Sequence, residues 1–316
     1  MLELPLRELR NYRGISPKPE DFDAYWDKAI GELDTVKPIP ELVPAEFEAK
    51  GVECFHLWYT GVRGAKIYAK YLRPKGNGEF PALLHFHGYS MNSGDWSSYL
   101  QYVHQGMCVF AMDCRGQGGL SQDVGGVTGN TQQGQIIRGI WDDPQDLLFR
   151  HIFLDTMQLY RVAAAMPEVD ETRVAAAGGS QGGALAVACS ALTGKIKLSA
   201  IQYPFLSDYK RIVEMGIHGT AYQEILEYFR RFDPMHEKED EFFERLGYID
   251  VHHLAGRIRG KALVAIGLND EICPPSTCFA VYNAIPGEKR LCLFPEFGHE
   301  WLPKYGDMVF EFLRGL

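Results

Sequence analysis

A serine flanked by glycines, in the run Gly178-Gly179-Ser180-Gln181-Gly182, constrains the fold of this chain more than any other feature. It follows the apolar segment 173–177 and precedes a second run of small apolar residues, 183–188. Glycine tolerates backbone turns that are too sharp for residues with a Cβ atom. The pattern therefore predicts a buried strand, a tight turn and a helix, with Ser180 at the apex of the turn.

A strand, a turn and a helix with serine at the apex are typical of the nucleophile elbow of α/β-hydrolases, which transfer acyl groups through a serine ester. The helix N-terminus behind the serine also favours negative charge that develops during reaction. Taken alone, the same turn could bind phosphate or have no chemistry. In this fold the chain order is serine, acid, histidine, so the partners of Ser180 should lie downstream.

A candidate acid follows the apolar segment 262–267, which has the character of a buried strand. Asp270 comes just after this strand and before the loop marked by Pro274-Pro275. We therefore expect Asp270 to be the acid. Asp208 is the alternative, and Glu271 is a weaker one.

A candidate base, His299, lies on a loop between the strand-like segment 290–294 and a last helical segment, 302–313. A serine hydroxyl is a poor nucleophile until a base takes its proton, which is the role that we expect for His299. His85 and His87 precede Ser180, on the wrong side for a base in this chain order.

The tetrahedral intermediate of acyl transfer needs two N–H donors that form an oxyanion hole. One is expected from the backbone of Gln181, directly after the nucleophile. The strand-like segment 81–87 ends at Gly88, which lets the chain turn so that the N–H of Tyr89 faces the serine. The alternative is that Gly88 only ends a core strand.

Composition limits the remaining classes of protein. The chain has 316 residues, 46% of them hydrophobic, which favours one large α/β domain. Its net charge is −9 without a basic stripe, so nucleic acid is not an expected partner. No secretory signal or apolar stretch of membrane-spanning length is visible, so we expect no membrane association. Seven cysteines without a C-x-x-C pair indicate reduced thiols and a cytoplasmic location.

Metal binding is not expected from this pattern. The two neighbours His252 and His253 are the closest pair of candidate ligands, and adjacent side chains on a helix should not both face one ion.

Alternating strand-like and helical segments predict a doubly wound, mostly parallel sheet of the α/β-hydrolase type. We expect an antiparallel start over 51–58 and 66–73, then strands near 81–87, 107–112, 172–178, 197–203, 261–267 and 289–295. We expect a single domain over 1–316, with an N-terminal extension over 1–45 that holds a helix at 21–33, an interface-type insertion over 116–143 and a lid-like helical insertion over 207–254.

Three ordered motifs give the chain a close resemblance to a known family. Asp113-Cys114-Arg115-Gly116-Gln117-Gly118, Gly178-Gly179-Ser180-Gln181-Gly182 and His299-Glu300 match the signature motifs of the acetyl xylan esterase/cephalosporin C deacetylase family, which is carbohydrate esterase family seven. The resemblance extends over nearly the whole chain and includes the segment 125–130.

The resemblance implies a role for each matched residue. Ser180 would be the nucleophile, His299 the base, Asp270 the acid that orients it, and the N–H groups of Tyr89 and Gln181 the oxyanion hole. Residues that support the site would be Arg115, Gln117, Gly178 and Gly182. The resemblance also implies a doughnut-like hexamer whose active sites face an internal cavity, with much of the subunit interface in 119–143.

The function implied is that of a serine esterase, without metal or organic cofactor, which removes acetyl groups from acetylated xylo-oligosaccharides and from cephalosporin C. One alternative is another serine hydrolase of this fold: a general carboxylesterase, a thioesterase or a peptidase. A peptidase would need an acidic pair that recognises an amine, and the sequence shows no clear one. The other alternative is a non-catalytic binding protein. The presence of Ser180, Asp270 and His299 argues against it, because a binding protein does not require a nucleophile elbow.

Overall fold

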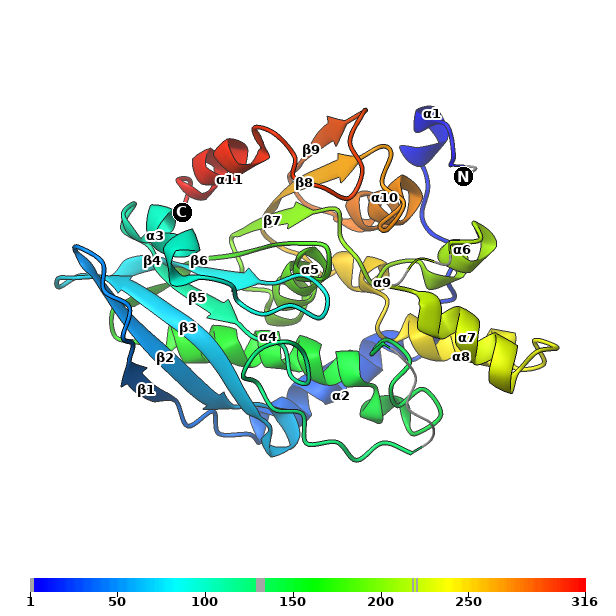
Figure 1. The fold of residues 1–316 in the computed structure, drawn as a ribbon, viewed down its shortest axis with the longest axis horizontal. Coiled ribbons are helices and arrows are strands. Elements are labelled where there is room, and N and C mark those ends of the chain that lie inside the picture. The colour runs from blue at the N-terminus through cyan, green and yellow to red at the C-terminus, as the bar shows by residue number, and fades with distance from the viewer. Residues whose placement is uncertain (1–2, 129–133, 218, 220) are drawn as a thin grey trace.

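A nine-stranded sheet lies at the centre of the computed structural model, which describes residues 3–128, 134–217, 219 and 221–316 (Figure 1). Its strands are β1 (Glu41–Pro44), β2 (Val52–Thr60), β3 (Lys66–Pro74), β4 (Phe80–Phe86), β5 (Cys108–Met112), β6 (Val169–Gly179), β7 (Leu198–Gln202), β8 (Lys261–Gly267) and β9 (Lys289–Phe294). They lie in the order β1-β2-β3-β5-β4-β6-β7-β8-β9. The pairs β1–β2, β2–β3 and β3–β5 are antiparallel, and all later pairs are parallel. The predicted fold class is therefore confirmed.

All eight predicted strands are present, and β1 is an additional one. The prolines of the segment 37–44 favour a connection, but Glu41 pairs opposite Trp58 in β2. All four residues of β1 are exposed. An edge strand without a buried face carries no alternation of apolar and polar residues, so its sequence gave no sign of it.

Helices cover both faces of the sheet. They are α1 (Leu6–Leu9), α2 (Phe22–Asp34), α3 (Leu100–Val103), α4 (Leu148–Ala164), α5 (Gln181–Thr193), α6 (Tyr209–Glu214), α7 (Gln223–Phe232), α8 (Glu239–Gly247), α9 (Val251–Ala255), α10 (Pro275–Ala284) and α11 (Tyr305–Leu313). Short 3₁₀ turns occupy 62–64, 96–99 and 144–146. Helices α3 and α11 pack on one face, and α4, α5, α9 and α10 pack on the other (Figure 1).

Successive residues of each strand point to opposite faces of the sheet. In β4, Leu84 belongs to the core under α4 and α5, whereas Leu83 belongs to the core under α3 and α11. Both side chains are fully buried. A central strand that is buried on both faces has a continuous apolar sequence, which is why β4 to β8 could be recognised.

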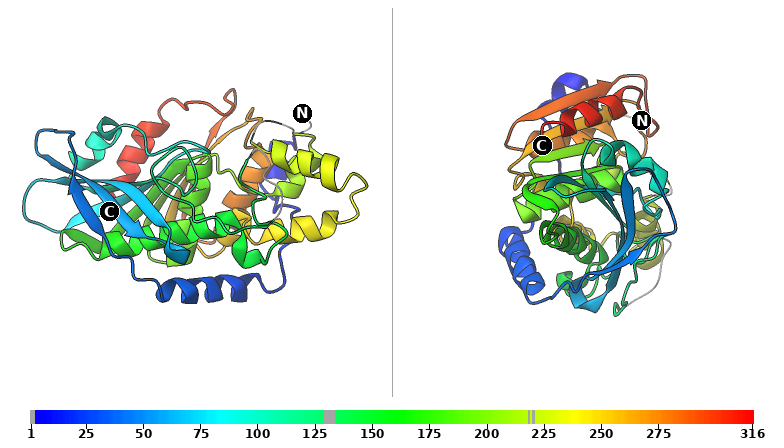
Figure 2. Two further views of the ribbon diagram at one scale, coloured as in Figure 1. Left: turned by 60° about the horizontal axis from the view of Figure 1, so that its bottom comes forward. Right: turned by 90° about the vertical axis from the view of Figure 1, so that its left-hand side faces the viewer.

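The predicted helix over 21–33 is α2, which packs against α4 on the outside of the molecule (Figure 2). Its residues Phe22 and Trp26 are fully buried, and the indole of Trp26 donates a hydrogen bond to the carbonyl of Tyr248 (3.0 Å). The N-terminal extension is therefore attached to the lid-like insertion as well as to the body.

The two insertions differ in their local structure. The described residues of 116–143 form no helix or strand, and Gly129 and Asn130, which belong to the resemblance, lie outside the described residues. The region 207–254 contains α6 to α9, and its α7 and α8 extend beyond the sheet (Figure 1). Among the described residues no helix combines the length and apolarity that crossing a membrane requires.

Candidate active site

The strand, turn and helix expected around Ser180 are present. Strand β6 ends at Gly179, Ser180 has φ 58° and ψ −123°, and α5 begins at Gln181. A positive φ at a residue with a Cβ atom costs on the order of 1–3 kcal/mol and persists only where the surroundings enforce it. Here the N–H of Ser180 donates to the carbonyl of Gln202 in β7 (3.0 Å), and its carbonyl accepts from the N–H of Phe205 (3.1 Å).

Gly178 and Gly182 permit the close approach of three elements beneath the turn. A Cβ atom on Gly182 would lie 2.1 Å from the carbonyl oxygen of Phe86 in β4, and one on Gly178 would lie 2.5 Å from the backbone of Gly182. Real Cβ atoms do not approach backbone atoms so closely. The absence of both side chains therefore brings the start of α5 against the end of β4, where the Tyr89 loop begins.

Asp270 and His299, which follow β8 and β9, are in direct contact. The Asp270 carboxylate is 1% exposed, and its Oδ2 accepts the Nδ1–H of His299 at 2.8 Å. Its Oδ1 accepts the backbone N–H groups of Ile272 and Cys273, both at 2.8 Å. Because a carboxylate partner holds the proton on Nδ1, the Nε2 atom of His299 carries the free lone pair.

The alternative acids lie elsewhere. Asp208 is fully buried and accepts hydrogen bonds from the N–H groups of Ile15 and Ser16 (2.9 Å each) and from the hydroxyl of Tyr12 (2.7 Å). It therefore fastens the N-terminal segment to the lid-like insertion. Glu271 is exposed. Asp270 is thus the carboxylate that the structure brings to His299.

The two expected oxyanion donors lie on segments that Gln117 ties together. Gln117 and Gln181 form a reciprocal pair of amide hydrogen bonds (2.8 and 3.0 Å), and Gln117 Oε1 also accepts the N–H of Ser90 (2.9 Å). The N–H of Gln181 is at the first turn of α5, where an N–H has no partner within its own helix. Among the described residues, no hydrogen-bond acceptor takes the N–H of Tyr89.

His87 orients the peptide unit that carries the Tyr89 N–H, a contact that the sequence did not predict. Its Nδ1 donates to the carbonyl of Gly88 (2.7 Å), and its Nε2 accepts the N–H of Cys114 (2.9 Å). The Gly88 carbonyl and the Tyr89 N–H belong to one planar unit and point in opposite directions. Burial lowers the pKa of His87, which keeps the ring in the neutral form that both bonds require. Chain order excluded His87 as a base but could not reveal this contact.

Arg115 does not reach the Ser180 turn. It is completely buried and forms two hydrogen bonds to the carboxylate of Asp155 on α4, both at 2.6 Å. Its guanidinium also donates to the carbonyl of Val62 (3.1 Å). Arg115 therefore joins the segment after β5 to α4, whereas Gln117, two residues on, points to the site.

A cavity of about 600 Å³ lies above the turn. Ser180 and His299 line it together with Tyr89, Phe205 and Ile272. The ring of His299 also packs on that of Tyr203 (4.4 Å between centroids), which lines the same cavity. The nucleophile, base and one oxyanion segment expected from the sequence thus open onto one space.

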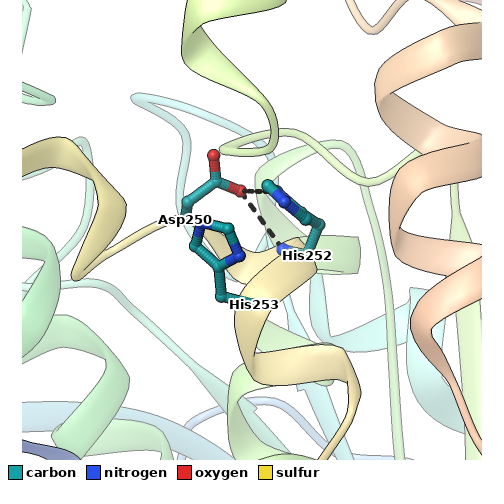
Figure 3. Close-up of side chains that lie close together, drawn as sticks. All are labelled: Asp250, His252 and His253. Carbon is teal, nitrogen blue, oxygen red and sulfur yellow. Dashed lines mark hydrogen bonds and ion pairs between the residues drawn. The ribbon is translucent and has the colours of Figure 1, made fainter. Parts of the chain in front are cut away.

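Two groups of three side chains in the described residues bring potential metal ligands within 4.8 Å of one another. One is Asp270, Cys273 and His299, at the site itself. The other is Asp250, His252 and His253 (Figure 3). The expectation that the two histidines could not converge was wrong, because their rings lie only 3.8 Å apart on the short helix α9.

The second group is already occupied by hydrogen bonds within the protein. His252 Nδ1 donates to Asp250 Oδ1 (2.6 Å), Asp250 Oδ2 accepts the N–H of Asp208 (2.7 Å), and His253 Nε2 donates to the carbonyl of Pro17 (3.2 Å). Figure 3 shows the carboxylate bonded to both the ring and the backbone of His252. The group holds α9, the Asp208 segment and the N-terminal segment together.

The arrangement of strands, the turn at Ser180 and the Asp270–His299 contact define the chain as an α/β-hydrolase. More distant solved structures share this fold, including an acylaminoacyl peptidase from Pyrococcus horikoshii at 13% identity (TM-score 0.61, covering 89% of this chain and 42% of that one). The chain belongs to the acetyl xylan esterase (AXE1) family, whose model matches residues 1–316. It is a carboxylic ester hydrolase.

Two solved structures from acetyl xylan esterases are similar to this chain over nearly their whole length. Acetyl xylan esterase 1 from Thermoanaerobacterium sp. JW/SL YS485 is 54% identical, with a TM-score of 0.97 over 99% of this chain and 98% of that one. Acetyl xylan esterase from Paenibacillus sp. R4 is 35% identical, with a TM-score of 0.94 over 99% of both chains. Acetyl esterase Axe7A from Xylanibacter ruminicola is 25% identical over 88% of this chain, which spans only 62% of that relative's length.

Proposed function

We propose that the chain is a serine acetylesterase that uses Ser180, His299 and Asp270 to remove acetyl groups from small O-acetylated carbohydrates. The observation that carries the proposal is the 2.8 Å hydrogen bond from His299 Nδ1 to Asp270 Oδ2, on a histidine that shares a cavity with Ser180. The strained backbone of Ser180 at a strand-to-helix turn supports the same assignment.

In the proposed reaction Ser180 Oγ attacks the acetyl carbonyl carbon while His299 Nε2 accepts the hydroxyl proton. The backbone N–H groups of Tyr89 and Gln181 stabilise the oxyanion. The C–O bond to the sugar then breaks, and His299 returns the proton to the leaving alcohol. Water attacks the acetyl-enzyme with His299 again as base, which releases acetate and restores the serine. Asp270 holds the ring and stabilises the imidazolium throughout.

The substrates that we propose are acetylated xylo-oligosaccharides and the acetyl group of cephalosporin C. Support comes from the family and from the relatives named as acetyl xylan esterases. A cavity of about 600 Å³ is large enough for one acetylated sugar unit. We also propose a cytoplasmic location, which agrees with seven free, buried cysteines.

The test is a comparison of initial rates on acetate, butyrate and octanoate esters of one chromogenic alcohol, with acetylated xylo-oligosaccharides and 7-aminocephalosporanic acid measured beside them. The proposal expects rapid release of acetate, a steep fall with acyl length and loss of all activity in Ser180→Ala. Flat rates with acyl length would reject the substrate class but keep the triad. No hydrolysis of any ester would favour a binding protein.

We further propose that the chain assembles into a hexamer through the insertion over 116–143. Leu120 and Val124 in this insertion are 55% and 49% exposed, so two large apolar side chains are available for contact with another subunit. Light scattering on the purified protein should give the mass of six chains. The mass of a single chain at micromolar concentration would reject the assembly without affecting the proposed chemistry.

A further inference from the structure

Glu224, on α7 of the lid-like insertion, is a buried carboxylate that binds the backbone of the other insertion. It is 2% exposed, and Oε1 accepts the N–H groups of Gln135 (2.9 Å) and Ile136 (2.7 Å), while Oε2 accepts that of Ile137 (3.2 Å). A carboxylate away from water is unfavourable unless hydrogen bonds replace its hydration. The positions of this backbone and of Glu224 therefore depend on each other.

The same carboxylate holds the side chain of Tyr89. The Tyr89 hydroxyl donates to Glu224 Oε1 (3.2 Å) and accepts from the N–H of Gln135 (2.7 Å). The Tyr89 ring packs against Phe205, with 5.4 Å between centroids. Glu224, Gln135 and Tyr89 thus form a closed triangle of hydrogen bonds behind one wall of the cavity.

This wall faces the proposed nucleophile. Tyr89, Phe205 and Gly134 line the cavity that Ser180 and His299 also line. Gly134 lies directly against the carboxylate, because a Cβ atom on it would be 2.4 Å from Glu224 Oε1. One carboxylate therefore determines the position of both the Tyr89 ring and the backbone at Gly134.

We propose that Glu224 is a positioning residue that sets the width of the cavity beside Ser180 and so gives the enzyme its preference for acetyl over longer acyl groups. The inference rests on the proposed function. Glu224 does not touch the reacting atoms; it acts through Tyr89 and Gly134. A confined pocket discriminates one added methylene by roughly 10- to 200-fold, so a small outward movement of this wall is enough to change acyl selectivity.

Protonation of Glu224 should also change the position of the cavity wall formed by Tyr89, Phe205 and Gly134. Burial raises its pKa to about 6, against the lowering effect of the three N–H groups and the Tyr89 hydroxyl. The proton would add a donor where all neighbours are already donors, so the wall should loosen below this pH. The titratable and charged groups around it are Tyr89 and Tyr209 on α6. In a second cavity of about 500 Å³, which Glu224 also lines, they are Arg138, Tyr228, Asp233, Glu237 and Lys238.

The experiment is to compare kcat/KM for acetate and butyrate esters of one alcohol in the wild type, in Glu224→Gln and in the control Glu227→Gln. Glu227 lies one turn further along α7 and pairs with Arg231 (2.6 Å). The acetate-to-butyrate ratio should fall roughly fivefold or more in Glu224→Gln and stay constant in the control. Partial unfolding lowers both rates equally and leaves the ratio unchanged, so the ratio separates positioning from stability.

Two further readouts keep the inference open to refutation if Glu224→Gln does not fold. The wild-type ratio should decrease below about pH 6, and Tyr89→Phe should decrease it at pH 8. A wild type that hydrolyses acetate esters, with a ratio that neither pH nor substitution moves, overturns the inference and leaves the proposed function intact. A wild type that hydrolyses no acetate ester removes both.

Discussion

The carboxylate of Asp270 binds His299 Nδ1 at 2.8 Å, while its other oxygen is held by two backbone N–H groups. Backbone N–H groups therefore hold the carboxylate that orients the His299 ring. A carboxylate in this position keeps the proton on Nδ1 and leaves a lone pair on Nε2, which the proposed reaction uses as the base. The orientation of His299 thus follows from the turn after β8.

Asp270→Asn should lower kcat for an acetate ester about 10³- to 10⁴-fold, because the amide favours the wrong histidine tautomer. The asparagine oxygen still accepts the N–H groups of Ile272 and Cys273, so the melting temperature should change little. Steady-state kinetics together with circular dichroism would check both expectations. Near-normal turnover in this variant, with the fold intact, would show that Asp270 does not orient the base.

His87→Ala should lower kcat roughly 10- to 100-fold, a part of what is lost when one oxyanion donor is removed, because the Gly88–Tyr89 peptide unit loses its anchor. His87→Asn places an amide nitrogen near the position of Nδ1 and should recover part of the rate. Both variants are compared with wild type at saturating acetate ester. Equal rates in all three would mean that the Gly88 carbonyl does not control the oxyanion donor.

The buried pair of Arg115 and Asp155 should matter for stability rather than for chemistry. Asp155→Asn should reduce the free energy of unfolding by about 3–5 kcal/mol, because it leaves a buried guanidinium without its charge partner. The double variant Arg115→Met with Asp155→Leu should recover much of that loss. Urea unfolding measures these differences. If the folded double variant had lost its esterase activity, Arg115 would have a role in the reaction itself.

The pair of His252 and Asp250 should make stability depend on pH. Burial opposes the charged imidazolium, but Asp250 outweighs it and raises the pKa of His252 above 6.5. Burial likewise acts to raise the pKa of Asp250, and His252 lowers it below 3.8. The stability that His252 contributes to the folded protein is complete below pH 6.5 and is lost as the pH rises through the raised pKa of His252. The stability that Asp250 contributes is lost as the pH falls through the lowered pKa of Asp250.

His252→Gln should therefore destabilise the protein most near pH 5, by about 3 kcal/mol, and less at pH 9. Urea unfolding of the wild type and the variant across this range provides the measurement. A difference between them that stays constant, or grows toward pH 9, would contradict the assigned charge of His252.

The sequence was sufficient for the elbow and for the positions of the parallel strands along the chain, because both depend on local patterns. Gly182 is required because a Cβ atom there would collide with the backbone of Phe86. A glycine two residues after the serine, in a turn that follows an apolar run, already indicates such a close approach. The contact of Asp270 with His299 was also predictable, since each follows a strand at the same edge of the sheet.

The contacts that the sequence did not reveal are those between distant segments. His87 lies 27 residues from Cys114, and Glu224 lies 89 residues from Gln135, so the partner of each side chain is far away along the chain. Strand β1 was missed because it has no buried face. These contacts and this strand depend on how distant segments pack against one another. A single sequence carries no local signal for such packing.

In the proposed reaction Ser180 carries the acetyl group during turnover. The most direct test of this step is acid quenching of the enzyme during hydrolysis of an acetate ester, followed by peptide mass spectrometry, with Ser180→Ala treated in parallel. We expect an acetylated peptide in which the modification is on Ser180, and neither acetylation nor turnover in the variant. Turnover that persists in Ser180→Ala, or an acetyl group that accumulates on another residue of the wild type, would contradict the proposed reaction.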